Sequence, residues 1–198
     1  MTQENRNPGL TDLDDSLLIV IDAQEAFLEK LEKGHAQLII SRIQWLVKAA
    51  AQLHVPIMAT AENKKKLGGT VPEISQFFPP KTQEHDKVYF GLTGHSRILA
   101  DVKQFGKQTV VLVGLETDVC VMQSAIGLLQ HGFRVVALSD ATASPGPCHE
   151  AGLLRMQNAG VIISTVKGLF YEWTRKAGFA HETLDADLLE NPPPGIYL

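Results

Sequence analysis

Short apolar runs alternate along this chain with longer segments in which apolar residues recur at helical spacing. Residues 16–21 are apolar on both faces, which is typical of a parallel strand buried within a sheet. Residues 35–53 follow with apolar side chains on one helical face. Strands that alternate with helices predict an α/β fold. We expect a single-domain three-layer α/β/α sandwich with a mainly parallel, Rossmann-like sheet of about six strands.

The same pattern places the remaining elements. Further strands are expected at 55–60, 86–89, 108–114, 134–138 and 161–165. Further helices are expected at 96–105, 118–130 and 150–159. Residues 61–85, which contain glycines, prolines and a lysine run, are expected to form a long irregular loop of the kind that often serves as a functional lid.

No linker divides the chain, so we expect one domain over residues 1–198. Residues 1–15 form a polar N-terminal segment, which lacks the basic and then apolar pattern of a secretory signal. Residues 185–198 contain three consecutive prolines and are expected to form an extended tail that wraps over a surface or a partner.

Composition narrows the class of function. With 44% hydrophobic and 20% charged residues, the chain resembles an ordinary globular protein. The net charge of −4 argues against a nucleic-acid binder, which normally presents a basic face. No apolar run approaches the roughly 20 residues that span a bilayer, so no membrane association is expected. Two cysteines do not make a disulfide framework, and a cytoplasmic, reduced protein is the expectation.

Three candidate functional segments lie at or near the ends of predicted strands. Ligands of parallel α/β sheets bind beyond the carboxyl ends of the strands, which directs attention to Asp22, Lys87 and residues 114–120. Taken alone, Asp22 is equally suited to act as a base, to cap the next helix or to hold a metal. Lys87, flanked by Asp86 and Val88, has the ordinary interpretation of a solvated charge.

Cys120 lies in the first turn of the predicted helix 118–130. A thiol there is near the positive end of the helix dipole, which predicts a lowered pKa and a nucleophilic thiolate. Free backbone N–H groups at the same helix start suit an oxyanion hole. The alternative is a structural cysteine, because free cysteines are among the most buried residues. Dinucleotide, P-loop and zinc motifs are missing from the sequence, and its histidines are scattered.

Three ordered motifs together resemble the isochorismatase-like cysteine hydrolases, a family that includes nicotinamidases and N-carbamoylsarcosine amidases. Residues 114–121, Gly-Leu-Glu-Thr-Asp-Val-Cys-Val, resemble the nucleophile motif of that family. Residues 22–27 resemble its Asp-x-Gln-x-x-Phe motif, and residues 87–91 resemble its lysine followed by an aromatic and a small residue. The resemblance runs from about residue 16 to residue 169, and the cysteine motif is the specific part.

The resemblance implies a role for each of these residues. Cys120 would be the nucleophile, Asp22 would carry the thiol proton to the leaving group, and Lys87 would hold both electrostatically. Family members often have a non-proline cis peptide before the cysteine, here between Leu115 and Glu116. It would bring the N–H of Glu116 beside that of Cys120 in the oxyanion hole. The residues that the resemblance places at the substrate are Gln24, Phe27, Asn63, Phe90 and Thr117.

The sequence departs from the nicotinamidases in one segment. Those enzymes hold a metal through an Asp-x-His set after the second strand, whereas residues 61–69 here contain no histidine and one carboxylate. We therefore expect no metal and no cofactor, and a closer likeness to the metal-free isochorismatase-domain branch. The lysines at 64–66 are open to two interpretations: a solvated loop, or a basic rim that attracts an anionic substrate.

The predicted function is hydrolysis of an amide, ureido or other C–N bond of a small molecule through a covalent Cys120 intermediate. One alternative is vinyl-ether hydrolysis, as with isochorismate. Another is a non-catalytic binding or scaffold protein that keeps the fold. The family resemblance and the proline-rich tail also predict a homo-oligomer, a dimer or larger.

Overall fold

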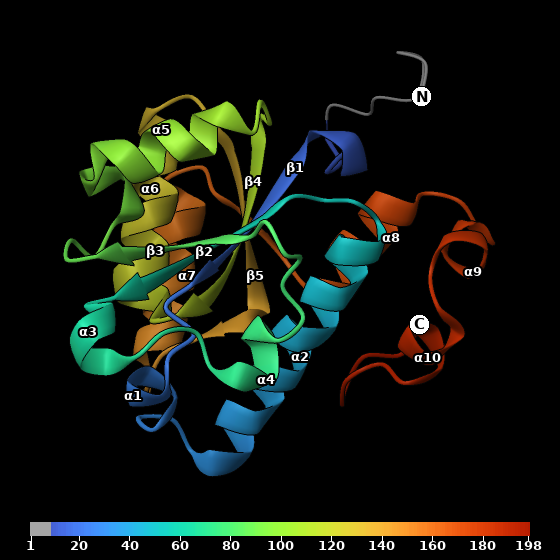
Figure 1. Ribbon diagram of the computed structural model, residues 1–198, viewed down its shortest axis with the longest axis horizontal. Helices are drawn as coiled ribbons and strands as arrows, with labels where there is room; N and C mark the ends of the chain where they lie inside the picture. Colours follow the sequence, from blue (N-terminus) through green and yellow to red (C-terminus); the bar gives the residue numbers. More distant parts are fainter. Residues whose placement is uncertain (1–8) are drawn as a thin grey trace.

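The protein folds around a six-stranded sheet with the strand order β3-β2-β1-β4-β5-β6, in a computed structural model that describes residues 9–198 (Figure 1). Every neighbouring pair of strands is parallel, and helices cover both faces, which confirms the predicted fold class. The strands are β1 (Ser16–Ile21), β2 (Ile57–Glu62), β3 (Gln83–Lys87), β4 (Thr109–Leu115), β5 (Arg134–Ala143) and β6 (Ile162–Ser164). Of the predicted segment 1–15, residues 1–8 lie outside the described residues.

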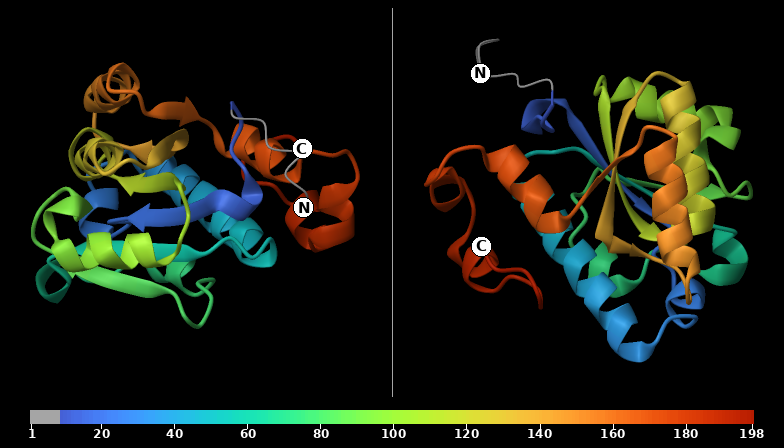
Figure 2. Two further views of the ribbon diagram at one scale, coloured as in Figure 1. Left: turned by 90° about the horizontal axis from the view of Figure 1, so that it is seen from above. Right: turned by 180° about the vertical axis from the view of Figure 1, so that it is seen from behind.

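Two helical layers sandwich the sheet. The helices are α1 (Glu25–Leu28), α2 (Lys33–Gln52), α3 (Lys64–Leu67), α4 (Pro72–Ser75), α5 (Ser96–Gln104), α6 (Met122–Gln130), α7 (Cys148–Asn158), α8 (Val166–Thr174), α9 (Phe179–Thr183) and α10 (Ala186–Glu190). Helices α2 and α8 pack on one face, and α5, α6 and α7 pack on the other (Figure 2). Alternate residues of β1 point to opposite faces, with Leu18 in the first core and Leu17 in the second.

The strand order reverses between β1 and β4, the two central strands. From β1 the chain adds β2 and β3 on one side, and from β4 it adds β5 and β6 on the other. The crevice at such a switch point is where ligands bind in open parallel sheets. Gly114 allows the two strands to approach there, because a Cβ at its φ of 118° would lie 1.9 Å from the carbonyl oxygen of Ile21.

Some elements differ from their predicted bounds. Strand β5 continues to Ala143, where a loop was expected from residue 140, because its pairing with β4 resumes after a register shift. The predicted helix 118–130 is divided into a π-helical turn, η4 (Thr117–Val121), and α6. The expected irregular segment 61–85 includes the short helices α3 and α4.

The C-terminal tail packs on its own chain. Trp45 of α2 donates its indole N–H to the carbonyl of Leu188 at 2.8 Å, and Ile196 is buried in the same core. Residues 186–190 form α10, so the tail is not extended throughout (Figure 1). The surface that the tail covers is therefore α2 of the same molecule. Among residues 9–198, no helix has the length and apolar character that a membrane crossing requires.

Candidate active site

Four side chains from consecutive strand ends meet at the carboxyl edge of the sheet. Asp22 follows β1, Glu62 ends β2, Lys87 ends β3 and Cys120 follows β4. One carboxylate oxygen of Asp22, one of Glu62 and the sulfur of Cys120 all lie within 4.8 Å of one another. Because all the strands are parallel, residues 98 positions apart in sequence reach the same edge.

Asp22 and Lys87 form a fully buried ion pair. Lys87 Nζ lies 2.6 Å from Asp22 Oδ2, and the exposed fractions of the two residues are 1% and 0%. The ammonium also donates hydrogen bonds to the carbonyls of Phe90 at 2.9 Å and Tyr89 at 3.3 Å. Thr60 Oγ1 donates to Asp22 Oδ1 at 2.8 Å. The solvated interpretation of Lys87 is therefore wrong, because the fold buries the end of β3 against Asp22.

The backbone of Asp22 is unusual. Its φ is 47°, in the left-handed region that non-glycine residues seldom occupy, although Asp tolerates it better than most. Its N–H donates to the carbonyl of Thr60 at 3.0 Å and its carbonyl accepts from Gln24 at 2.8 Å, so both sides of the residue are held. Such conformations persist where the surrounding structure enforces them, often at functional sites.

Cys120 lies in the π-helical turn η4 and is 2% exposed. Its sulfur donates a hydrogen bond to Glu62 Oε2 at 3.6 Å. Burial raises the pKa of the thiol, the negative charge of Asp22 raises it further, and the Lys87 ammonium counteracts only part of the rise. The prediction of a lowered pKa is therefore wrong, because burial and two nearby carboxylates outweigh the helix dipole.

Glu62 is a residue of the site that was not predicted from the sequence. Its backbone is fixed by Gln24, whose amide oxygen accepts from Glu62 N at 2.7 Å and whose amide nitrogen donates to Glu62 O at 3.0 Å. The missed signal was its place at the end of a strand adjacent to β1. The second strand was predicted to end at residue 60, two positions too early.

The three residues before Val119 are each held by a side chain from elsewhere. Glu116 pairs with Lys30 at 3.0 Å, Thr117 Oγ1 hydrogen-bonds His149 Nδ1 at 2.9 Å, and Asp118 accepts from the hydroxyl of Ser144 at 2.6 Å. The peptide bond between Leu115 and Glu116 is cis. These contacts fix the turn that carries Cys120, residues 116–121 (the Cys120 turn), against the loops around it.

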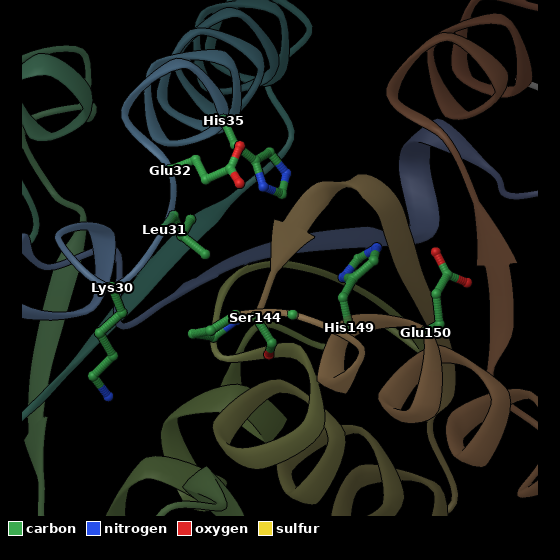
Figure 3. Close-up of a pocket in the computed structure, with 9 residues that line it drawn as sticks. Lys30, Leu31, Glu32, His35, Ser144, His149 and Glu150 are labelled. Atoms are coloured by element: carbon green, nitrogen blue, oxygen red, sulfur yellow. The ribbon is translucent and has the colours of Figure 1, made fainter.

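A cavity of about 330 Å³ lies beside the Cys120 turn, between the segment that enters α2 and the start of α7 (Figure 3). Figure 3 shows His35 and Glu32 on one wall and His149 and Glu150 on the other. Burial lowers the pKa of His149, so its neutral form is favoured at neutral pH. The cavity lining includes Lys30, Ser144 and His149, the side chains that hold the turn, but not the buried Asp22–Lys87 pair.

Of the five residues predicted to contact substrate, three are buried and two are exposed. Gln24 is fully buried, and its amide is committed to the backbone of residues 62 and 68. Phe27 belongs to the core beneath Lys30, and Thr117 is buried against His149. Asn63, with a φ of 43°, and Phe90 are exposed near the strand ends.

The donor set at the strand ends does not suit a resident metal ion. Asp22, Glu62 and Cys120 offer ligand atoms, but the Lys87 ammonium already lies against the Asp22 carboxylate as its cation. A divalent ion there would share the Asp22 carboxylate with a buried lysine whose ammonium also donates to two carbonyls.

Residues 16–168 match the isochorismatase domain family. The chain is 30% identical over 172 residues to the secreted isochorismatase effector Isc1 of Phytophthora sojae, a match that covers 82% of this chain and 79% of that protein. The resemblance stated from the motifs is thus confirmed over almost the same residues.

Solved structures share the fold. The MAR1 ribonuclease of Caenorhabditis elegans superposes with a TM-score of 0.83 at 27% identity, covering 96% of this chain and 97% of that one. The ycaC gene product of Escherichia coli, described as an octameric hydrolase of unknown specificity, superposes with a TM-score of 0.85 at 22% identity, covering 96% and 94%.

Proposed function

The chain belongs to the isochorismatase family of hydrolases, and from this we propose that it cleaves an amide, ureido or related C–N bond of a small molecule through Cys120. The observation that carries the proposal is the meeting of a buried thiol, a carboxylate and a buried lysine at the carboxyl edge of the sheet. A scaffold protein has no need to bury a lysine and an aspartate beside a thiol, because such burial is costly.

In the proposed reaction, Cys120 Sγ attacks the electrophilic carbon while its proton passes to Asp22. The C–N bond breaks as Asp22 delivers this proton to the leaving nitrogen, and an acyl-thioester forms. Water then adds its hydroxyl to the acyl carbon and its proton to Asp22. The C–S bond breaks, the acid leaves, and the proton returns to sulfur, so that one water converts one amide to an acid and an amine.

The raised pKa of Cys120 bears on the first step. A thiol that is protonated in the free enzyme requires a base at the moment of attack, and Asp22 lies within 4.8 Å of it. Lys87 Nζ lies 2.6 Å from the same carboxylate and is proposed to position it beside the thiol. The N–H groups of Glu116 and Cys120 are proposed to bind the developing oxyanion.

Substitution of the nucleophile tests the proposal. We expect Cys120→Ala to lower kcat/KM by more than about 10³-fold, as removal of a nucleophile does in other hydrolases. Cys148→Ala is the matched control, because this exposed cysteine lies outside the site and its loss should leave activity unchanged. A panel of amides, ureido acids and isochorismate, read by mass spectrometry for an acyl adduct on Cys120, separates C–N from vinyl-ether cleavage. Equal activity of Cys120→Ala and wild type would contradict the proposal.

Assembly and location are also proposals. The octameric state given for the Escherichia coli ycaC product supports a homo-oligomer here, which light scattering tests directly. A cytoplasmic location stays a prediction from cysteine content. The ribonuclease named among the neighbours does not change the proposed substrate class, because a net charge of −4 and two carboxylates beside the thiol disfavour a polyanion.

A further inference from the structure

Glu62 is the one carboxylate of the cluster that the proposed reaction does not use. Asp22 is engaged at both oxygens, by Thr60 at Oδ1 and by Lys87 at Oδ2. Glu62 instead places Oε2 3.6 Å from the sulfur of Cys120, the atom that would attack the substrate. The group bound at that oxygen therefore lies beside the reacting carbon.

The charges at the strand ends do not cancel. Lys87 balances Asp22, and both are buried. Within residues 9–198, no ion pair joins Glu62 to a cation. The lysine nearest to it in sequence, Lys64, pairs with Glu84 instead. An ionised Glu62 thus leaves one negative charge beside the nucleophile without a compensating cation.

The hydrogen bond that Glu62 accepts is easily exchanged. A thiol is a weak donor, so the N–H of a substrate would bind the carboxylate more strongly and release the sulfur for attack. The backbone from which the carboxylate extends is held in place, because both backbone polar groups of Glu62 are bonded to the amide of the buried Gln24. A carboxylate on a backbone held in this way stays within reach of the sulfur and of a group bound beside it.

We infer that Glu62 is the specificity-determining residue of this site, and that it selects substrates carrying a cationic, N–H-rich nitrogen group, such as an amidinium, guanidinium or ammonium, next to the carbon that Cys120 attacks. Substrates with a carboxylate at that position are disfavoured by the same charge. This inference rests on the proposed role of Cys120 and adds the substrate class.

The charge preference can be measured without knowing the substrate. Aminoethyl, methyl and sulfonatoethyl methanethiosulfonate carry a positive, neutral and negative group, and each forms a mixed disulfide with a thiol as methanesulfinate leaves. Rates at Cys120 and at the exposed Cys148 are followed in the same sample by peptide mass spectrometry. The ratio of cationic to anionic rate at each cysteine reports the local potential, because the intrinsic reactivity of that thiol cancels.

We expect this ratio to be on the order of tenfold higher at Cys120 than at Cys148, and Glu62→Gln to remove most of the difference. Glu62→Asp keeps the charge and should keep the preference even if its fold is less stable. Glu73→Gln, which removes one exposed charge from α4, is the matched control and should leave the ratio unchanged.

Two results would overturn the inference: equal ratios at the two cysteines of the wild type, or a Glu62→Gln ratio that changes no more than that of Glu73→Gln. Neither result would contradict the proposed function, which is tested separately by the loss of hydrolysis in Cys120→Ala. Conversely, full hydrolysis by Cys120→Ala would refute the proposed function and remove the basis of the inference, whatever the labelling ratio.

Discussion

At the scale of single residues, the Asp22–Lys87 pair is the least replaceable feature of the site. Burying an ion pair costs desolvation energy that is recovered only when the remaining polar atoms are bonded. Here the lysine reaches two backbone carbonyls and the aspartate accepts from Thr60, so both charged groups have further hydrogen-bond partners. The pair therefore holds the ends of β1 and β3 together.

Removing one charge of the Asp22–Lys87 pair should lower the free energy of unfolding more than removing both charges. Lys87→Met leaves a buried carboxylate without its cation and is expected to lower the free energy of unfolding by about 3–5 kcal/mol. The double variant Asp22→Asn, Lys87→Met removes both charges and should recover a large part of that loss. Urea unfolding followed by the fluorescence of the buried Trp45 and Trp173 measures both variants. Equal destabilisation of the single and double variants would show that the unpaired buried charge is not the cause of the lost stability.

At the scale of elements, helix α7 and the Cys120 turn are packed in direct contact. Gly152 of α7 faces the backbone of Asp118, and a Cβ there would lie 2.8 Å from Asp118 N and Cα. Gly152 thus allows α7 to approach the turn closely, while His149 of the same helix bonds Thr117. The position of Cys120 depends on this contact between two elements that are distant in sequence.

Gly152→Ala should force the two elements apart. Overpacking of this kind costs about 1–3 kcal/mol, which exceeds the gain in helix propensity of up to about 1 kcal/mol. We also expect a lower kcat, because the turn that carries Cys120 moves. Gly34→Ala in α2 is the control: open space surrounds that position, so the change should be neutral or stabilising by up to about 1 kcal/mol. Thermal unfolding and kcat compare the two, and equal effects would contradict the close approach.

At the scale of the whole molecule, the C-terminal tail completes the core on the outer side of α2. Leu188 and Ile196 are buried there, and Trp45 bonds the carbonyl of Leu188. Figure 2 shows this C-terminal segment beside α8 and α2, on the opposite side of the sheet from α6 and α7. The tail therefore stabilises its own chain.

Leu188→Ala should lower the free energy of unfolding by about 2–5 kcal/mol, as loss of a buried leucine does elsewhere. Leu198→Ala, at a partly exposed position in the same tail, should change it by less than about 0.5 kcal/mol. Because Leu188 packs on α2 of the same molecule, light scattering should find the assembly unchanged in both variants. A change of assembly with unchanged stability would assign the tail to a partner instead.

The sequence by itself determined the architecture and the edge of the sheet at which the candidate residues lie. Apolar runs buried on both faces specify central parallel strands, and parallel strands place Asp22, Lys87 and Cys120 at one edge. These consequences follow from the pattern of apolar residues, which is local in the sequence, and from the general rule that the carboxyl ends of parallel strands share one edge of the sheet.

Tertiary structure alone decided the electrostatics. Whether Lys87 is solvated or buried, whether the pKa of Cys120 falls or rises, and whether Glu62 reaches the sulfur depend on contacts between strand ends far apart in sequence. Helix dipole and motif predict a reactive thiolate at Cys120, but burial and the charges of two carboxylates act over a few ångströms and are stronger. Those distances exist only once the sheet has formed.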